Sequence, residues 1–285
     1  MAVELHGRVV AITGGARGIG RSIAEHLARA GARVAIGDLD PEAADLPDGV
    51  TALELDVTDR ASVERFADEV EERLGPLDVF VNNAGILLTG PFLEEDDAAT
   101  EREIAVNLMG VIHGMRVAIP RMQARGRGQV VNIASGASYI APPGEVSYSA
   151  TKHAVLALTD GVRQELKDSG LTITAIFPGL VDTELAAGTK PPRASKWITT
   201  DDVAEGVVRA IREQRPEVFV PREMGVLLRM NRSTPARGRQ FLNRLFGMDA
   251  VALQPDAADR AKRASYMERI GLSPEQAGAS ARDDG

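Results

Sequence analysis

The sequence predicts a protein of the α/β class, in which helices cover both faces of a parallel sheet. Short runs of β-branched residues alternate with longer segments whose apolar residues recur at the helical period. This alternation is typical of strands joined by crossover helices. A length of 285 residues with 44% hydrophobic residues suffices to bury the core of such a sheet.

Seven runs are expected to form strands, which is enough for a doubly wound sheet. In chain order they are Val9–Thr13, Arg33–Gly37, Ala52–Asp56, Asp78–Val81, Val130–Ala134, Thr172–Phe177 and Val218–Val220.

Two helices are predicted on clear apolar faces. The first lies between the third and fourth strands, with Thr58 as its expected N-cap and Gly75-Pro76 as its stop. The second opens at Thr200, and acidic residues follow at its positive end, where carboxylates are stabilised. The residues expected to face inward are Val63, Phe66, Val70 and Leu74 in the first helix, and Val203, Val207, Ala210 and Ile211 in the second.

The alternation of strands and helices ends near Pro221. We therefore expect a sheet domain over 1–221, a helical extension over 222–272 and a flexible tail over 273–285. Six arginines and one glutamate give residues 222–246 a local charge of +5. Apolar residues accompany these charges, and four interpretations stay open: packing on the sheet domain, a lid over a substrate pocket, a subunit contact, or a membrane-surface patch. The apolar residues are Leu227, Leu228, Phe241, Leu242, Leu245 and Phe246.

Composition excludes several classes of function. The chain has no cysteine, so it cannot form a disulfide, a thiolate nucleophile or a Cys-ligated metal site. Its four histidines are scattered without ligand spacing, and we expect no metal. A formal net charge of −8 opposes non-specific binding to nucleic acid. The N-terminus does not resemble a signal peptide and no 18-residue apolar stretch follows, so a cytoplasmic location is expected.

The first strand runs directly into a glycine-rich loop and then into a helix predicted over 21–31. Gly14 is expected to turn the chain tightly, Gly18 to leave room for a pyrophosphate, and Gly20 to let the helix approach the strand. Arg17 and Ile19 lie in the same loop. The GxxxGxG spacing differs from GxGxxG, and no GK[ST] follows as in a P-loop. Taken alone, the loop fits either a dinucleotide site or a plain turn between a strand and a helix.

Asp38 ends the second strand, about where a carboxylate meets the ribose of a bound dinucleotide. A carboxylate repels the 2′-phosphate of NADP, whereas Arg17 attracts it. We expect NAD, with NADP as the alternative if Arg17 dominates.

Further motifs follow in a fixed order along the chain. Asp56-Val57 comes after the third strand, Asn82-Asn83-Ala84-Gly85 after the fourth, and Asn107 lies in the helix AVNLMG. Ser135 ends the fifth strand, Tyr148 and Lys152 follow in YSATK, and Pro178-Gly179 ends the sixth strand. Over residues 5 to about 221, this ordered set resembles the short-chain dehydrogenase/reductase family of Rossmann-like, nicotinamide-dependent oxidoreductases.

The resemblance implies roles for these residues. Ser135, Tyr148 and Lys152 would be catalytic with support from Asn107, and no metal would be needed. Asp56 and Val57 would hold the adenine, Val181 and Thr183 would position the nicotinamide, and the groove between them would be lined by Asn82, Asn83, Ala84, Gly85, Pro178 and Gly179. It also implies a homodimer or homotetramer. Apolar residues of the Tyr148 helix serve either that contact or the subunit's own core: Val155, Leu156, Leu158 and Val162.

Tyr148 and Lys152 are four residues apart, so on a helix both project from one face. We expect Lys152, together with an oxidised nicotinamide, to lower the pKa of Tyr148 from ~10 toward ~7 and make it a usable base. Ser135 would then orient the substrate oxygen. Ser138 is a rival for this role, but the thirteen-residue interval to Tyr148 favours Ser135.

These residues predict an NAD-dependent secondary-alcohol dehydrogenase or the corresponding carbonyl reductase. The segment 182–200 lies where this fold places its substrate-covering loop, and its apolar residues favour a lipophilic alcohol or ketone, such as a steroid, retinoid or terpenoid. The alternatives are an NADPH-dependent carbonyl reductase and a non-catalytic nucleotide sensor. The apolar residues are Leu185, Pro191, Pro192 and Trp197.

Overall fold

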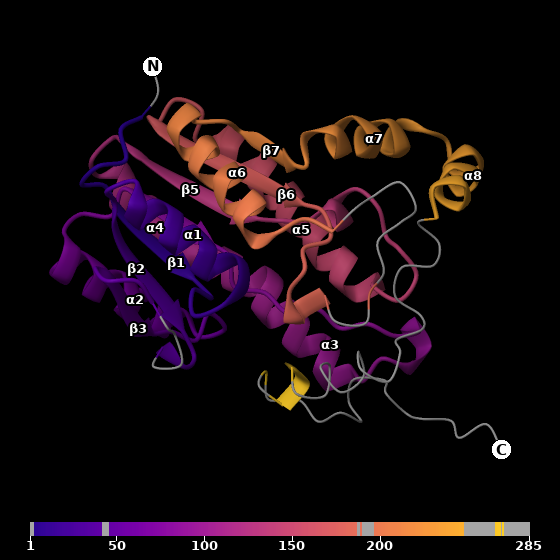
Figure 1. Ribbon diagram of the computed structural model, residues 1–285, viewed down its shortest axis with the longest axis horizontal. Coiled ribbons are helices and arrows are strands. Elements are labelled where there is room, and N and C mark those ends of the chain that lie inside the picture. Colours follow the sequence, from indigo (N-terminus) through magenta and orange to yellow (C-terminus); the bar gives the residue numbers. More distant parts are fainter. Residues whose placement is uncertain are drawn as a thin grey trace.

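A single sheet of seven parallel strands, in the order β3-β2-β1-β4-β5-β6-β7, lies at the centre of the protein (Figure 1). The structure is a computed structural model that describes residues 3–41, 46–186, 189, 197–247, 266–268 and 270. The strand order reverses between β1 and β4, and such a switch point opens a crevice at the carboxyl ends of the strands.

All seven predicted strands are present. The structure gives β1 Val9–Thr13, β2 Arg33–Asp38, β3 Val50–Glu54, β4 Val79–Asn82, β5 Gly128–Ile133, β6 Leu171–Pro178 and β7 Glu217–Val220. Most bounds differ from the expected runs by one or two residues: β4 is shifted one residue later, and β5 begins two residues earlier and ends one residue earlier. Strand β3 begins and ends two residues earlier than expected, so Asp56 lies in the loop after it.

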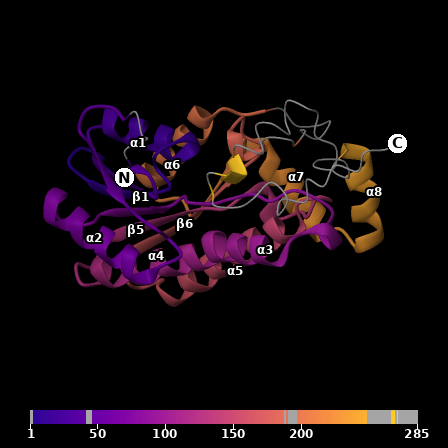
Figure 2. The same cartoon turned by 90° about the horizontal axis from the view of Figure 1, so that it is seen from below.

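Helices form a layer on each face of the sheet (Figure 2). One layer consists of α1 Gly18–Arg29 and α6 Thr200–Glu213, which contact each other. The other consists of α2 Arg60–Leu74, α4 Gly110–Gln123 and α5 Val146–Glu165. Beyond the carboxyl ends of the strands lie α3 Asp97–Ile104, which runs into a π-helix at Ala105–Met109, and the C-terminal helices α7 Arg222–Ser233 and α8 Ala236–Phe246. Short 3₁₀ turns occur at Phe92–Glu94, Gly136–Ser138 and Glu184–Ala186.

The structure shows which residue caps α2 and where α6 begins. The expected N-cap Thr58 is wrong: Asp59 caps α2 and accepts hydrogen bonds from the amides of Ala61 and Ser62, because Thr58 itself donates to Asp56. Gly75 ends this helix as expected, with φ +96°. Helix α6 begins at Thr200, as predicted.

Two hydrophobic cores hold the layers together. Between the sheet and α1 and α6, the buried residues include Ile23 and Leu27 together with all four inward residues predicted for α6. Between the sheet and α2, α4 and α5, they include Val63, Phe66 and Val70, while Leu74 is only partly buried. The apolar positions read from the helical period therefore face the sheet.

The apolar side of α5 is used within the chain. Val155 and Leu156 are buried in the core beneath the sheet, and Leu158 and Val162 pack against it partly buried. Of the two uses left open by the sequence, the structure shows packing on the subunit's own core.

The helices of the C-terminal extension differ in how they are packed. Leu228 of α7 is buried, whereas Val226 and Met230 of α7 and Phe241 of α8 are exposed. The side chains of Leu242, Leu245 and Phe246, and the tail 273–285, lie outside the described residues. Within the described part of the chain, no helix has the length and apolar character needed to cross a membrane.

Candidate active site

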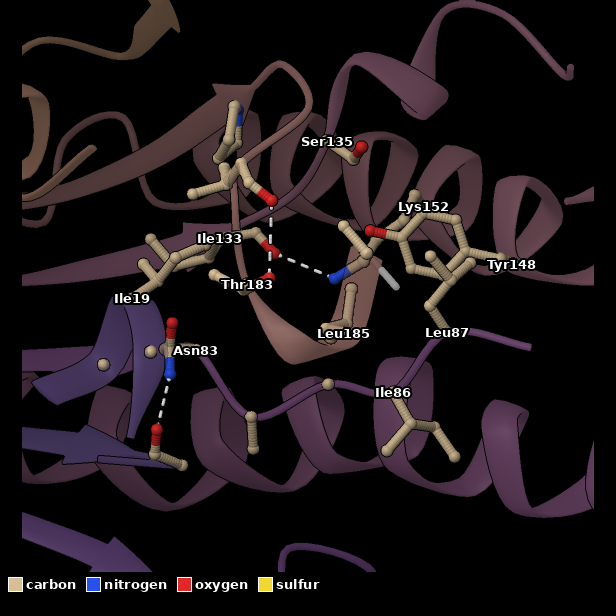
Figure 3. Close-up of a pocket in the computed structure, with 18 of the residues that line it drawn as sticks. Ile19, Asn83, Ile86, Leu87, Ile133, Ser135, Tyr148, Lys152, Thr183 and Leu185 are labelled. Atoms are coloured by element: carbon tan, nitrogen blue, oxygen red, sulfur yellow. Dashed lines mark hydrogen bonds between the residues drawn. The ribbon is translucent and has the colours of Figure 1, made fainter. Parts of the chain in front are cut away.

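A cavity of about 1480 Å³ lies at the carboxyl ends of the strands (Figure 3). It extends from the glycine loop, past the ends of β4 and β5, to α7 and the C-terminal residues Tyr266 and Ile270. Pockets for single drug-sized ligands measure roughly 300–1,000 Å³. The cavity therefore has room for a large cofactor and a substrate together.

The glycine loop has the geometry that its spacing predicts. Gly14 has φ +66°, and a Cβ on Gly20 would lie 2.2 Å from the carbonyl oxygen of Gly14, so only glycine lets α1 begin this close to the strand. Gly18 has φ +55°, and a Cβ there would project toward Thr183, whose Cγ2 is 3.9 Å away. Gly18 thus leaves a cradle between the start of α1 and the loop after β6.

Thr13 and Asn83 join the two strands that meet at the switch point. The Asn83 side-chain amide donates to the carbonyl oxygens of Thr13 at 2.9 Å and Gly14 at 2.8 Å. In return, the Thr13 hydroxyl accepts from the amides of Asn83 and Ala84, both at 3.0 Å. Asn83 therefore lines the cavity, whereas its neighbour Asn82 is buried and bonds Asn132, so the groove-lining role expected for Asn82 is wrong.

Asp38 and Arg17 both line the cavity near the glycine loop. The carboxylate of Asp38 accepts from the amide of Ala16 at 3.0 Å and from the amide of Leu39 at 2.9 Å. Two backbone donors thus fix the carboxylate beside the loop.

The remaining residues expected to contact a cofactor surround the same cavity. Asp56 is oriented by Thr58, whose amide and hydroxyl donate to it at 2.9 and 2.7 Å. The others that line the cavity are Ile19, Gly20, Val57, Ala84, Gly85, Pro178, Gly179, Val181 and Thr183.

Ser135 and Tyr148 both line the cavity, and Figure 3 shows their side chains near each other. The Ser135 hydroxyl is also the acceptor for the amide of Ala137 at 3.1 Å. The rival Ser138 is fully buried and donates to the backbone carbonyl of Lys152 at 2.8 Å. Of the two serines, the structure therefore places Ser135 beside Tyr148.

Lys152 lies one turn after Tyr148 on α5, with its Nζ 5.6 Å from the centroid of the Tyr148 ring. The ammonium donates to the backbone carbonyl of Ile133 at 3.0 Å. Burial lowers the pKa of Lys152 to about 8, although the nearby carboxylate of Glu103 opposes this shift.

The pKa of Tyr148 is raised, opposite to the shift expected from its lysine neighbour. Burial is the largest cause because it removes water from the phenolate, and the carboxylates of Glu145 and Glu103 add repulsion. The neighbouring Ser135 side chain lowers the pKa of Tyr148 but is outweighed. The protein's own groups therefore keep Tyr148 in its phenol form at neutral pH.

Asn107 lies in the π-helix and is fully buried. Its Oδ1 accepts from the amide of Ile86 at 2.8 Å, and its Nδ2 donates to the carbonyl of Ile86 at 2.8 Å and to Thr151 at 3.3 Å. Isolated π turns are frequent at functional sites. Asn107 therefore holds the loop after β4 to α5, close behind Lys152 and Gly85.

Several cavity residues were missed in the sequence. The successive amides of residues 86–88 donate to Asn107 at 2.8 Å, to the Tyr266 hydroxyl at 3.0 Å and to Glu103 at 2.8 Å. Glu145, Tyr266 and Ile270 line the cavity as well. Tyr266 and Ile270 are spaced i, i+4, the one signal that could have marked them as one face of a turn of helix.

Helix α7 of the C-terminal extension packs against β7 of the sheet domain, which was one of its four interpretations, and it also contributes to the cavity. Met224, Leu227 and Leu228 of α7 line it, and so do Leu185 and Trp197 of the segment 182–200. Gly188, Pro191 and Pro192 of that segment lie outside the described residues.

Comparison with known proteins agrees with this geometry. Residues 8–194 match the family model of the short chain dehydrogenases. The chain is 37% identical over 225 residues to 3beta-hydroxysteroid dehydrogenase 2 of Eggerthella lenta, covering 75% of this chain and 85% of that protein. It is 39% identical over 188 residues to sorbitol dehydrogenase of Cereibacter sphaeroides, covering 64% of this chain and 73% of that protein.

A solved short chain dehydrogenase from Burkholderia cenocepacia, in complex with NADP, has the same architecture. It superposes with a TM-score of 0.74 at 28% identity, covering 86% of this chain and 99% of that chain. The shared sheet, the glycine loop and the family match together establish that the chain is an oxidoreductase belonging to the short-chain dehydrogenase family.

Proposed function

We propose that this enzyme transfers a hydride between NAD and a lipophilic secondary alcohol or the corresponding ketone, with Tyr148 as its acid and base. The observation that carries this proposal is that Tyr148, Ser135 and Lys152 line one cavity, with the Lys152 Nζ 5.6 Å from the centroid of the Tyr148 ring.

The residues around the cavity fit a nicotinamide dinucleotide. The first amides of α1 lack partners within the helix and suit a pyrophosphate, and Gly18 leaves the cradle that a Cβ would fill. Asp38 would hold the ribose, Asp56 and Val57 the adenine, and Val181 and Thr183 the nicotinamide amide. When bound, the cofactor supplies the acceptor or donor of hydride.

The protein's own residues manage the proton and the substrate oxygen. In ketone reduction, the Tyr148 phenol donates a proton to the oxygen as its negative charge develops, and the Ser135 hydroxyl donates a hydrogen bond to it. In alcohol oxidation, Tyr148 accepts the hydroxyl proton. The Lys152 Nζ lies 5.6 Å from the ring centroid, where its positive charge would favour the phenolate once a cofactor and substrate are bound.

NAD is favoured over NADP because Asp38 is held at the glycine loop by two backbone amides. A carboxylate fixed in this way accepts hydrogen bonds from ribose hydroxyls and repels a 2′-phosphate. Arg17 lines the same part of the cavity and favours the alternative, an NADPH-dependent reductase.

A lipophilic substrate is favoured by the residues around the Tyr148 end of the cavity. Apolar residues predominate in the lining of the cavity and include Leu87, Ile140, Leu185, Trp197, Leu227 and Ile270, while Glu145 is a charged residue close to Tyr148. The named relatives include both a steroid dehydrogenase and a sorbitol dehydrogenase, so family membership alone does not select the substrate. The apolar lining favours the steroid-like choice.

A panel of secondary alcohols and ketones tests this proposal. Cyclic terpenoid, retinoid and steroid alcohols are compared with polyols of similar size, each with NAD and with NADP, by the absorbance of the reduced nicotinamide. We expect the highest kcat/KM with apolar alcohols and NAD. Turnover of polyols alone would contradict the substrate class, and dinucleotide binding without turnover of any substrate would favour a nucleotide sensor.

We also expect a homo-oligomer. Leu158 and Val162 of α5 are only partly buried in the chain's own core, so this helix keeps accessible surface for a subunit contact. Sedimentation at micromolar concentration measures the assembly directly, and a monomer there would contradict this expectation.

A further inference from the structure

A short segment far along the chain contributes to the cavity. Tyr266 and Met267 are buried, and Tyr266 and Ile270 line the cavity beside residues of the sheet domain. The family match ends at residue 194, so this segment lies outside the part of the chain that the family model describes. The family model therefore does not account for its contribution to the cavity.

A buried hydrogen bond anchors the segment to the loop after β4. The Tyr266 hydroxyl accepts from the amide of Leu87 at 3.0 Å. The flanking amides of Ile86 and Leu88 are bonded to Asn107 and Glu103, so this loop is fixed at three successive positions. A buried amide that loses its acceptor costs about 1–3 kcal/mol, which gives the Tyr266 contact a defined role in holding the segment.

The anchor lies at the Tyr148 end of the cavity. Figure 3 shows Leu87 beside the Tyr148 ring, with Ile19 and Asn83 of the cofactor half on the opposite side. Tyr266 is also close enough to Tyr148 to add a small electrostatic contribution to its raised pKa. Tyr266 therefore belongs to the substrate half rather than to the dinucleotide half.

We infer that Tyr266 is a specificity-determining residue that, with Ile270, forms the outer wall of the substrate half and selects bulky apolar alcohols. This inference rests on the proposed function and deepens it. A large ring system fills the space between Tyr148 and this wall, so it buries apolar area against Tyr266. A short-chain alcohol reaches Tyr148 and Ser135 without touching the wall and gains nothing from it.

Two substitutions distinguish the contribution of the Tyr266 ring from that of its hydrogen bond with Leu87. Tyr266→Ala removes both the ring and the hydroxyl, whereas Tyr266→Phe keeps the ring and removes only the acceptor for Leu87. Tyr139→Phe is the matched control, because Tyr139 packs against Phe177 and Phe219 and is not among the cavity-lining residues described.

We expect Tyr266→Ala to lower kcat/KM for bulky cyclic alcohols by about tenfold or more through KM, because pocket contacts of this size are worth roughly 1–3 kcal/mol. Values for 2-butanol and the dissociation constant of NAD should change less than about twofold. Tyr266→Phe should retain the preference for bulky over small alcohols, because the ring is kept. Amide hydrogen exchange at Leu87 should become faster, because its acceptor is lost. Equal losses for large and small alcohols, or unchanged kinetics in Tyr266→Ala, would overturn the inference.

A binding measurement keeps this test separate from the proposed activity. Trp197 is the single tryptophan of the chain and lines the cavity, so its fluorescence reports ligand binding without turnover. If the wild type oxidises no alcohol, the proposed function fails. The inference is then judged by binding of a steroid alcohol: weaker binding to Tyr266→Ala than to wild type supports it, and equal binding overturns it.

Discussion

Lys152 lies beneath Tyr148, with its Nζ 5.6 Å from the ring centroid and its proton donated to the carbonyl of Ile133. The lysine is thus held by the end of a strand while the tyrosine faces the cavity. Both residues are carried by α5, so their separation is set by one turn of helix.

Tyr148→Phe should abolish most turnover, because it removes the only phenolic proton at the proposed reacting position. General acid–base catalysis contributes about 10²–10⁴-fold, which sets the expected fall in kcat. The dissociation constant of NAD, measured by titration, should be nearly unchanged. Tyr139→Phe provides the control and should retain wild-type kcat; a comparable loss there would mean that general destabilisation explains the effect.

Because the pKa of Tyr148 is raised, ketone reduction and alcohol oxidation should depend on pH in different ways. The phenol is the form needed for ketone reduction, so kcat/KM for reduction should be flat through neutral pH. Alcohol oxidation needs the phenolate, so its kcat/KM should rise with pH. Initial rates measured in both directions from pH 6 to 9 test this, and an oxidation rate that is independent of pH would contradict it.

Lys152 should make folding stability depend on pH in alkaline solution. Its pKa falls from 10.5 to about 8 on folding, so between these values the unfolded chain binds a proton that the folded protein has released. Stability then rises with pH by up to about 1.4 kcal/mol per unit across this window. Below about pH 8 both states carry the proton, and the burial penalty is fully present.

Lys152→Met removes this titration. The unfolding free energies of wild type and Lys152→Met are measured by urea titration from pH 7.5 to 10. The value for the wild type minus the value for Lys152→Met should increase as pH rises. A constant difference would show that the lysine has an ordinary pKa in the folded protein.

Asp38→Asn should shift cofactor preference from NAD toward NADP. Asparagine keeps an oxygen that accepts from the amide of Ala16, so the loop is retained while the charge is lost. Hydrogen bonds to charged groups are worth about 1.5–3 kcal/mol, and KM for NAD should rise about tenfold or more while KM for NADP falls. Steady-state kinetics with both cofactors measure the ratio, and an unchanged ratio would favour control by Arg17.

Gly18→Ala should weaken dinucleotide binding, because a Cβ fills the cradle facing Thr183. Overpacking of this kind costs about 1–3 kcal/mol, equivalent to about a tenfold to hundredfold loss of NAD affinity by titration. Gly49→Ala is the matched control, since Gly49 also has positive φ but no neighbour within 4 Å of the added Cβ. Both variants should lose stability, and only Gly18→Ala should lose affinity.

Much of the fold could be predicted from the sequence, because apolar residues recur with different spacings in its strands and in its helices. Every expected strand formed, and apolar residues such as Phe66 and Val207 face the sheet as their spacing predicts. The helix start was wrong by one residue because Thr58 and Asp59 both suit an N-cap, and only the contact of Thr58 with Asp56 decides between them. Local competition of this kind is invisible in sequence spacing.

The electrostatics of the site were less predictable. A spacing of four residues places Lys152 near Tyr148. The sign of the Tyr148 pKa shift depends on burial, on Glu145 at the N-cap of the same helix, and on Glu103 from a distant part of the chain. The role of Tyr266 was missed for the same reason, because its partner Leu87 is 179 residues away. Such long-range contacts follow from the tertiary fold rather than from any local motif.

The bond between Leu87 and Tyr266 also bears on how the enzyme matures during synthesis. Once β7 has left the ribosome, all seven strands are available, and the sheet can complete its dinucleotide crevice while Tyr266 has yet to be translated. If Tyr266 selects the substrate as inferred, a nascent chain at that stage has the residues that would bind the nucleotide but lacks the one that discriminates between alcohols. Selectivity would then be acquired last, when Tyr266 reaches a loop that was translated 179 residues earlier.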